Sequence, residues 1–267
     1  MSIKDFLEGK PSKRALRRIK DKDLYETVEE VFDSFTVLTL YNIIRKGIIK
    51  RIYGVISAGK EARVYWAKDN KGQDLAVKIY LTSTAEFRKG ILKYIIGDPR
   101  FENIPKSNIR KLIYAWTKKE YRNLKRLTDV GVRVPKPIYV MRNILVMEFI
   151  GHDGIRAPLL REIDLGEDEA YKVFNKIVEY VELMYYKAKL VHADLSEYNI
   201  MIYDGEPVII DVSQAVDISH PNALEFLRHD IETITKYFRD KLGLDVPSPE
   251  EIYARVLRWK DKKQYQD

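Results

Sequence analysis

Apolar residues repeat at helical spacing at both ends of the chain, and a β-type pattern lies between them. Residues 23 to 35 and 39 to 47 show the helical spacing, and Gly47 stands where a helix C-cap is expected. Residues 50 to 83 contain three runs rich in β-branched and aromatic residues, with the turn "DNKG" (69 to 72) between the second and third. This pattern predicts a helical extension followed by an antiparallel meander.

The next segments complete a first lobe. Residues 84 to 107 combine mixed charge with two glycines and the pair "DP" (98 to 99), and they predict a long mobile loop. Residues 107 to 131 have helical spacing with Gly131 just beyond their end, and residues 136 to 151 predict two strands around the turn "MRN". We therefore expect an antiparallel sheet of five strands with one helix.

The second half of the chain is predicted to be mainly helical. Helices are expected over 167 to 189 and 222 to 243, and "SPEE" from Ser248 has the composition of a capping box with Pro at the first helical position. Short apolar strands are expected around Asp194 and over 204 to 212. The predicted class is α+β, with three parts: a helical extension (1–49), a first lobe (50–150) and a smaller, mostly helical second lobe (151–267), the boundary lying near Gly151.

Composition limits the possible classes of protein. Of 267 residues, 45% are hydrophobic and 33% are charged, which is typical of a globular rather than a disordered chain. No apolar run approaches the roughly 20 residues of a membrane span, and the first residues lack the apolar core of a signal peptide. We expect a soluble, cytoplasmic protein without a membrane partner.

The absence of cysteine excludes disulfides and thiolate metal sites, and four scattered histidines make a zinc cage a poor fit. A bound metal should therefore have oxygen ligands. The formal net charge of +7 suits a partner rich in phosphate, but it is equally compatible with a surface that is simply basic.

The stretch "LVHADLSEYNIM" (190 to 201) carries the strongest chemical signal. Asp194 and Asn199 are five positions apart, and His192 precedes the aspartate. Phosphoryl transfer needs a carboxylate that orients or deprotonates the acceptor and a neutral oxygen ligand for Mg²⁺ close by. The spacing matches the catalytic loop of protein kinases, with Ala193 where Arg usually stands. Taken alone, the same residues also fit a polar turn.

Other residues occur in the order that this chemistry requires. Asp211 in "VIIDVS" ends an apolar strand, where a second carboxylate can hold Mg²⁺ against phosphates. Lys78 in "LAVKIY" stands on the third strand, where kinases place a phosphate-binding lysine, although strand lysines are often only solvated. Glu120 is its expected partner, with an ordinary surface ion pair as the alternative.

Two further segments complete the expected nucleotide site. "ISAGKEARVY" (56 to 65) stands at the position of the phosphate-covering loop, where Ser57 and Lys60 offer a hydroxyl and a charge. It has one glycine, Gly59, so an ordinary hairpin turn is an equal alternative. In "VMEFIG" (146 to 151), the backbone of Glu148 and Ile150 is placed to pair with an adenine edge.

Together, "SAGKEARVY", "AVKIY", "VMEFIG", "LVHADLSEYNIM", "VIIDVSQAV" and "HPNALEFLRHDI" resemble the RIO family of atypical protein kinases, in particular its type-one subfamily, from about residue 25 to 242. The resemblance implies a bilobal protein-kinase-like fold, the cofactors ATP and Mg²⁺ (or Mn²⁺), and Ser/Thr phosphorylation or ATP hydrolysis. It also implies a role in maturation of the small ribosomal subunit, with the subunit precursor or its rRNA as partner. The roles that it implies are catalysis by Asp194, metal binding by Asn199 and Asp211, transient phosphate acceptance by Asp211, phosphate binding by Ser57, Lys60 and Lys78, and an adenine hinge at Met147, Glu148 and Ile150.

Two departures from ordinary protein kinases change this interpretation. The 56 residues after Asp211 (267 minus 211) contain no Ala-Pro-Glu and no long loop before the next helix, so the usual platform for a substrate peptide is not apparent. Ala193 agrees with this, because the Arg usually found there helps to position an activation-loop phosphate.

Three functions stay open on the sequence. The first is a Mg²⁺-ATP-dependent kinase or ATPase. The second is an RNA- or pre-ribosome-binding factor that uses its nucleotide pocket as a conformational sensor, suggested by the net charge of +7 and the basic stretches 10 to 20 and 259 to 267, which are equally compatible with solvated ends. The third is a small-molecule phosphotransferase, since antibiotic kinases carry a similar loop. The protein substrate is not predicted.

Overall fold

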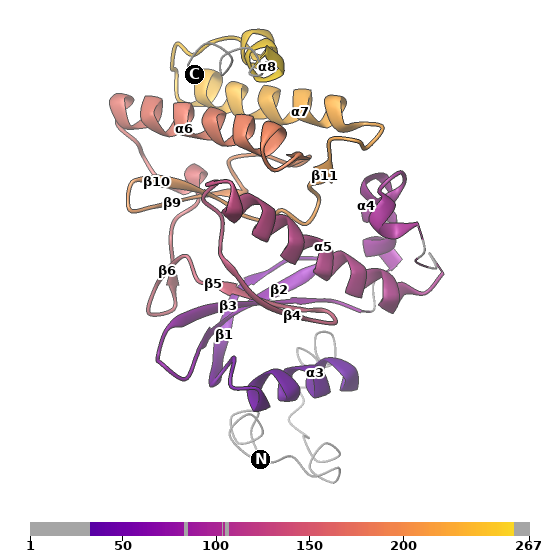
Figure 1. Cartoon of the computed structure of the whole chain (residues 1–267). Helices are drawn as coiled ribbons and strands as arrows, with labels where there is room; N and C mark the ends of the chain where they lie inside the picture. The colour runs from indigo at the N-terminus through magenta and orange to yellow at the C-terminus, as the bar shows by residue number, and fades with distance from the viewer. Residues whose placement is uncertain (1–32, 83–84, 103, 105–106, 259–267) are drawn as a thin grey trace, which may run out of the picture. The chain divides into compact units, whose positions relative to one another are not determined.

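The computed structural model describes residues 33–82, 85–102, 104 and 107–258 (Figure 1). Contacts divide the chain into two compact units. The first comprises Met1–Gly90, Ile104–Lys118 and Pro137–Arg156, and the second Ile91–Asn103, Lys119–Lys136 and Ala157–Asp267. Most of the helix expected over 23 to 35, and both basic stretches, lie outside the described residues. Within the described part of the chain, no helix is long and apolar enough to cross a membrane.

The first unit is built on an antiparallel sheet whose five strands have the order β1-β2-β3-β5-β4. The turn between the second and third strands is the predicted one, because the Asp69 carboxylate accepts hydrogen bonds from the backbone of Lys71 and Gln73 at 2.8 and 2.9 Å. The five predicted strands are thus confirmed. Their bounds are β1 (Arg51–Ala58), β2 (Ala62–Lys68), β3 (Asp74–Tyr80), β4 (Pro137–Met141) and β5 (Ile144–Glu148), followed by the small hairpin β6 (Gly151–His152) and β7 (Ile155–Arg156).

Helix α3 (Ser34–Arg45) covers one face of this sheet (Figure 1). Asp33 caps its start by accepting a hydrogen bond from the Thr36 backbone N–H at 2.7 Å. Buried side chains of the helix and of alternate strand positions form one apolar cluster, which includes Leu40, Ile43, Tyr65, Val77 and Val146. Because strand side chains alternate between faces, residues next to these positions lie on the opposite face of the sheet.

The predicted long loop over 84 to 107 is wrong. The segment forms helix α4 (Ala85–Ile95) and a 3₁₀ turn (Pro99–Phe101). The physical reason is an apolar stripe at helical spacing, which the glycine and the charges of the segment obscure in the sequence. Three buried side chains form this stripe, namely Ile91, Tyr94 and Ile95.

The second unit is mainly helical, as predicted. Helix α5 (Ile109–Asp129) confirms the helix expected over 107 to 131, and its residues are divided between the units after Lys118. The other helices are α6 (Glu167–Tyr186), α7 (Ala223–Lys236), which continues into a π-helical turn (Tyr237–Lys241), and α8 (Pro249–Arg258). The short elements are the 3₁₀ turn Leu160–Glu162 and strands β8 (Leu190–Val191), β9 (Ile200–Tyr203), β10 (Glu206–Ile209) and β11 (Val216–Asp217).

Helix α8 packs on α6 and α7 (Figure 1). The Arg255 guanidinium donates to the buried Glu182 carboxylate at 2.7 and 3.2 Å. At the start of α8 the predicted capping box is confirmed, because Glu251 accepts from the Ser248 N–H at 2.7 Å and Ser248 accepts from the Glu251 N–H at 3.2 Å.

Candidate active site

The loop from His192 to Asn199 is held at both ends by short strand pairs. Strand β8 enters it and pairs with β11, and strand β9 leaves it and pairs with β10. The Asn199 side-chain amide donates to the Asp194 backbone carbonyl at 2.7 Å and to its Oδ2 at 3.2 Å, which closes the loop on itself. The Asp194 side chain reaches the surface and is therefore accessible to a substrate.

Asp211 lies beside this loop. The backbone N–H of Ile210 donates to the carbonyl of Asn199 at 2.9 Å, and the Ser213 hydroxyl donates to Asp211 Oδ1 at 2.8 Å. Asp211 has a φ of 54°, which turns the chain sharply where the strand ends. The structure thus brings together Asp194, Asn199 and Asp211, three of the residues singled out in the sequence.

The donor set of this cluster fits a hard divalent cation. Within the described residues there is no group of three or more His, Cys, Asp or Glu side chains that could hold a metal ion by themselves. Mg²⁺ is commonly bound by one or two carboxylates together with substrate phosphates. One carboxylate at Asp211 and the amide oxygen of Asn199, on the side chain's edge away from Asp194, match that pattern.

The electrostatic environment of Asp194 favours proton acceptance. Partial removal from water raises the pKa of the Asp194 carboxyl, and the neighbouring Asp211 carboxylate acts in the same direction, whereas His192 and the Asn199 hydrogen bond oppose them. A carboxylate with a raised pKa is a better acceptor for the proton of a reacting hydroxyl than an ordinary surface carboxylate.

Asp230 on α7 supports the catalytic loop through two hydrogen bonds, and this residue was not among those predicted from the sequence. Its carboxylate accepts hydrogen bonds from the backbone N–H groups of Ala193 and Leu195, both at 2.8 Å. These two residues flank Asp194, and Ala193 has a φ of 67°, a conformation that needs such support. Burial raises the pKa of Asp230 to about 6, against the effects of His192 and the two backbone bonds. The sequence did contain a sign of this role, because Asp230 falls on the apolar stripe of a helix, where a carboxylate must be buried.

A second anchor holds the segment after Asp211. The Asn123 side chain donates to the carbonyls of Val212 and Ala215 at 2.9 and 3.1 Å, and the Lys119 ammonium donates to the carbonyl of Ser213 at 2.8 Å. Both side chains come from α5 and are fully buried. These anchors were also missed, since an Asn and a Lys on a helix normally indicate a solvated face.

The segment that was expected to be a loop takes part in this anchor. The Arg100 guanidinium donates to Asn123 Oδ1 at 2.8 Å and forms an ion pair with the buried Asp98 carboxylate at 2.6 Å. The hydrogen bonds and positive charge of Arg100 hold the pKa of Asp98 below its usual value, although burial acts in the opposite direction. Glu120, next to Lys119, is 1% exposed and so is not the surface ion pair considered as an alternative.

The remaining predicted site residues lie in the first unit. Lys78 on β3 is opposite Val64 on β2, which neighbours Ser57 on β1, and the alternate position Ala76 is opposite Met147 on β5. The side chains of Ser57, Lys78 and Met147 therefore share the face of the sheet that α3 leaves uncovered. Lys78 is 6% exposed, which excludes a freely solvated lysine.

Three more of the predicted residues lie at the ends of strands. Lys60 is exposed in the turn after β1, where the Gly59 N–H donates to the carbonyl of Ala62 at 3.0 Å. Glu148 ends β5 opposite Leu75, so its side chain points to the α3 face, and Ile150 is buried just beyond. Lys78 and Glu120 belong to different units, and their pairing stays a prediction.

Comparison with solved structures identifies the class of fold. The Rio2 kinase of Chaetomium thermophilum, in a complex described as containing ADP, Mg²⁺ and phosphoaspartate, matches with a TM-score of 0.65 and 22% identity over 85% of this chain and 68% of that one. A second structure of that kinase gives a TM-score of 0.62 and 24% identity, with 84% and 67% covered. The chain has a bilobal, protein-kinase-like α+β fold.

Comparison with known sequences identifies the family. The model of the RIO domain matches residues 63–252, and the chain belongs to the RIO family. The serine/threonine-protein kinase RIO1 of Caenorhabditis elegans is 44% identical over 91% of this chain and 48% of that protein, and the human protein of that name is 45% identical over 83% and 39%. The RIO-type serine/threonine-protein kinase Rio1 of Haloferax volcanii is 45% identical over 83% and 75%. The chain thus spans about half or less of the first two relatives.

Proposed function

We propose that the protein is a Mg²⁺-ATP-dependent serine/threonine kinase of the RIO type. The observation that carries this proposal is the closed loop in which Asn199 binds Asp194, with Asp211 directly beside it. Phosphoryl transfer depends mainly on the positioning of reactants and on the stabilisation of charge. Two side chains supply that positioning: Asp230 accepts hydrogen bonds from the backbone of the catalytic loop, and Asn123 donates hydrogen bonds to the backbone after Asp211.

In the proposed reaction, Asp194 orients the acceptor hydroxyl and takes its proton. The hydroxyl oxygen forms a bond to the γ-phosphorus while the bond from that phosphorus to the β–γ bridging oxygen breaks, and ADP leaves. Asn199 and Asp211 would hold Mg²⁺ or Mn²⁺, which when bound neutralises negative charge on the phosphates.

The residues of the first unit are proposed to bind ATP. Lys78 would contact the α- and β-phosphates and pair with Glu120, and Ser57 and Lys60 would cover the phosphates. The hinge segment formed by Met147, Glu148 and Ile150 would contact adenine, with backbone groups as donors and acceptors. In domain terms we propose an extension (1–49), a nucleotide-binding lobe (50–150) and a reduced second lobe (151–267).

Asp211 is also a proposed phosphate acceptor. Attack of its carboxylate oxygen on the γ-phosphorus would release ADP and leave an aspartyl phosphate, and attack by water on that phosphate would regenerate the carboxylate. The phosphoaspartate in the related Rio2 structure supports this proposal. The net result would be ATP hydrolysis without a protein substrate.

The proposed cellular setting is maturation of the small ribosomal subunit in the cytoplasm, with the subunit precursor or its rRNA as partner. A net charge of +7 supports contact with RNA. If the protein acts mainly as an RNA-binding factor, its affinity for structured RNA should fall steeply with salt. Absence of RNA binding at low salt would remove that second candidate.

Membership of the RIO family supports a protein substrate over a small molecule.

The test of the proposal is Asp194→Asn in the purified chain, with ATP binding, ATP turnover and autophosphorylation measured separately. We expect turnover and autophosphorylation to fall by about 10²- to 10⁴-fold with ATP affinity largely retained. Asp204→Asn is the matched control, because Asp204 lies exposed in the β9–β10 turn at a φ of 53° that Asn adopts readily. Unchanged turnover in Asp194→Asn would refute the assignment, and strong stimulation of the wild type by small-subunit precursor would identify the partner.

A further inference from the structure

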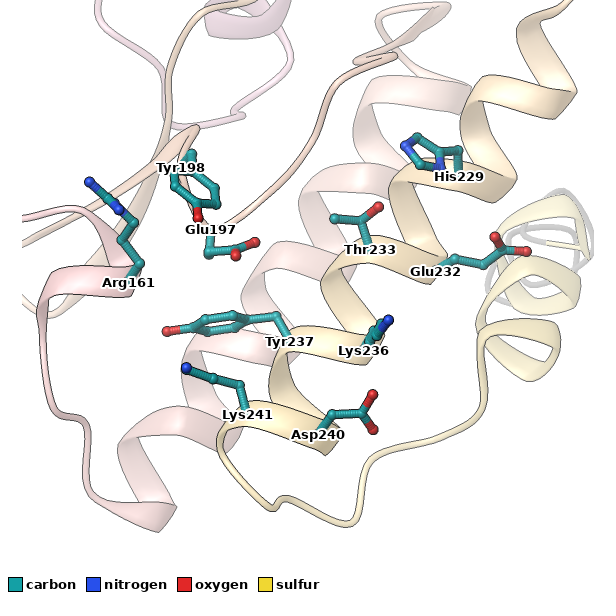
Figure 2. A pocket seen from close by; sticks show the side chains of 10 residues that line it. All are labelled: Arg161, Glu197, Tyr198, His229, Glu232, Thr233, Lys236, Tyr237, Asp240 and Lys241. Carbon is teal, nitrogen blue, oxygen red and sulfur yellow. The ribbon is translucent and has the colours of Figure 1, made fainter.

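The second unit contains an open groove of about 730 Å³ beside the catalytic loop. One wall is formed by Arg161, Glu197 and Tyr198, and the other by the solvent face of α7 and its π-helical turn (Figure 2). No residue of this groove belongs to the proposed ATP or metal site. Only residues 212 to 222 separate Asp211 from α7, so no long segment lies between them.

The groove has the dimensions of a short extended peptide. Its helical wall runs from His229 to Lys241, a separation of 12 residues (241 minus 229). At 1.5 Å per residue this wall is about 18 Å long, which matches about five residues of extended chain. The π-helical turn Tyr237–Lys241 forms one end, and such turns often occur at functional sites.

The groove contacts the same loop that carries Asp194. Glu197 and Tyr198 lie between Asp194 and Asn199, and the Arg161 guanidinium lies over the Tyr198 ring at 4.6 Å from its centroid. The Tyr237 hydroxyl donates to the carbonyl of Leu160 at 3.1 Å, which ties the helical wall to the opposite one. A chain bound in the groove would therefore pass next to the loop where the acceptor hydroxyl must react.

The charges of the groove favour a polypeptide. Three cationic and three anionic side chains line it, namely Arg161, Lys236 and Lys241 with Glu197, Glu232 and Asp240. Because the charges of the two signs are equal in number, the groove offers no net positive charge to a nucleic-acid backbone, in spite of the basic net charge of the chain. Apart from its two tyrosines, the residues that line the groove are polar or charged types, whereas small-molecule pockets are lined mainly by hydrophobic and aromatic residues. A peptide with charged side chains is the complementary ligand.

We propose that this groove binds the residues that flank the acceptor Ser or Thr of a protein substrate and reads their charge. Lys236, in the middle of the helical wall, would attract an acidic residue of the substrate. The inference rests on the proposed kinase function and deepens it, because it supplies a substrate platform where the sequence showed none.

The test uses the purified full chain with ATP, Mg²⁺ and a peptide library. Each peptide has a central Ser in a neutral background and one Asp or one Lys at a defined distance from it. The measured quantity is the ratio of kcat/KM for the acidic peptide to that for the basic peptide at each position, which does not depend on the fraction of active enzyme. Lys236→Glu is compared with Lys172→Glu, the same charge reversal on the exposed face of α6 outside the groove.

We expect the wild type to favour the acidic peptide at one or more positions, Lys236→Glu to lower that ratio about tenfold, and Lys172→Glu to match the wild type. An active wild type with no charge preference, or with the same preference in Lys236→Glu, would overturn the groove proposal alone. Failure of the wild type to phosphorylate any peptide or itself would overturn the proposed function together with it. Competition by an RNA oligonucleotide that Lys236→Glu abolishes would assign the groove to RNA and also reject the proposal.

Discussion

Replacement of Asp230 by Asn tests whether a buried carboxylate positions the catalytic loop. Asp230 accepts two backbone hydrogen bonds, from residues on either side of Asp194. Asn offers one acceptor oxygen, and its NH₂ group would face the second N–H. The loop would lose one of its two supports and the buried charge beneath it, so we expect kcat to fall at least tenfold.

The effect of Asp230 on stability follows from its pKa. A folded-state pKa of about 6, against 3.8 for the unfolded chain, means that the folded protein holds this proton more tightly. Stability from this group is therefore complete below pH 3.8 and is lost as the pH rises through 6, by about 3 kcal/mol in total at 1.36 kcal/mol per pKa unit. Roughly 2 kcal/mol of that loss falls between pH 4 and pH 7.

The assay is urea unfolding of the wild type, Asp230→Asn and the control Asp204→Asn at several values of pH from 4 to 7. Because Asn does not titrate, only the wild type loses the contribution of this group as the pH rises. The unfolding free energy of the wild type should therefore fall by roughly 2 kcal/mol relative to that of Asp230→Asn between pH 4 and pH 7. Asp204→Asn should give a curve parallel to that of the wild type. A constant difference for Asp230→Asn would refute the account of a carboxylate whose pKa is raised by burial.

Three other substitutions test separate features. Asn123→Leu removes the donor for two backbone carbonyls after Asp211 and should lower the free energy of unfolding by about 2–4 kcal/mol. It should also weaken Mg²⁺-dependent ATP binding. Thermal unfolding and Mg²⁺ titration measure the two effects, and an unchanged melting temperature would contradict the prediction. Gly154→Ala places a Cβ 2.7 Å from the Trp66 ring at a φ of +81° and should destabilise more than Gly205→Ala, which is strained (φ +76°) but has open space; equal losses in urea unfolding would argue against overpacking. Lys78→Met should weaken ATP binding roughly tenfold or more by calorimetry, and an unaltered affinity would exclude its proposed phosphate contact.

Much of the fold could be predicted because its determinants are local. The capping box at Ser248 joins residues three positions apart, and the stripe of α5 repeats within each turn of the helix. The helix over Ala85–Ile95 was missed, although it follows the same rule, because a glycine and a high charge content weaken the local signal. The prediction relied on the low helix propensity of the segment, whereas burial of its apolar side chains stabilises the helix.

The candidate site shows a similar division. Asp194 and Asn199 could be identified because their spacing within one loop already implies their hydrogen bond. Asp230 and Lys119 could not, since each looks like an ordinary helical polar residue until its partner is known. The partners of Asp230 lie 35 and 37 positions away, and the carbonyl that Lys119 binds lies 94 positions away.

Local patterns in the sequence were therefore enough to predict the helices with clear periodicity, the five strands, the residue types of the reaction and the resemblance to a kinase family. Which polar side chains are buried became clear only from the folded chain, since burial depends on contacts between segments far apart in the sequence. The tertiary structure also decided the positive φ angles of Ala193 and Asp211, because each unusual backbone conformation persists only where distant groups hold it. The groove beside the catalytic loop belongs to this second group, since its two walls come from different segments of the chain.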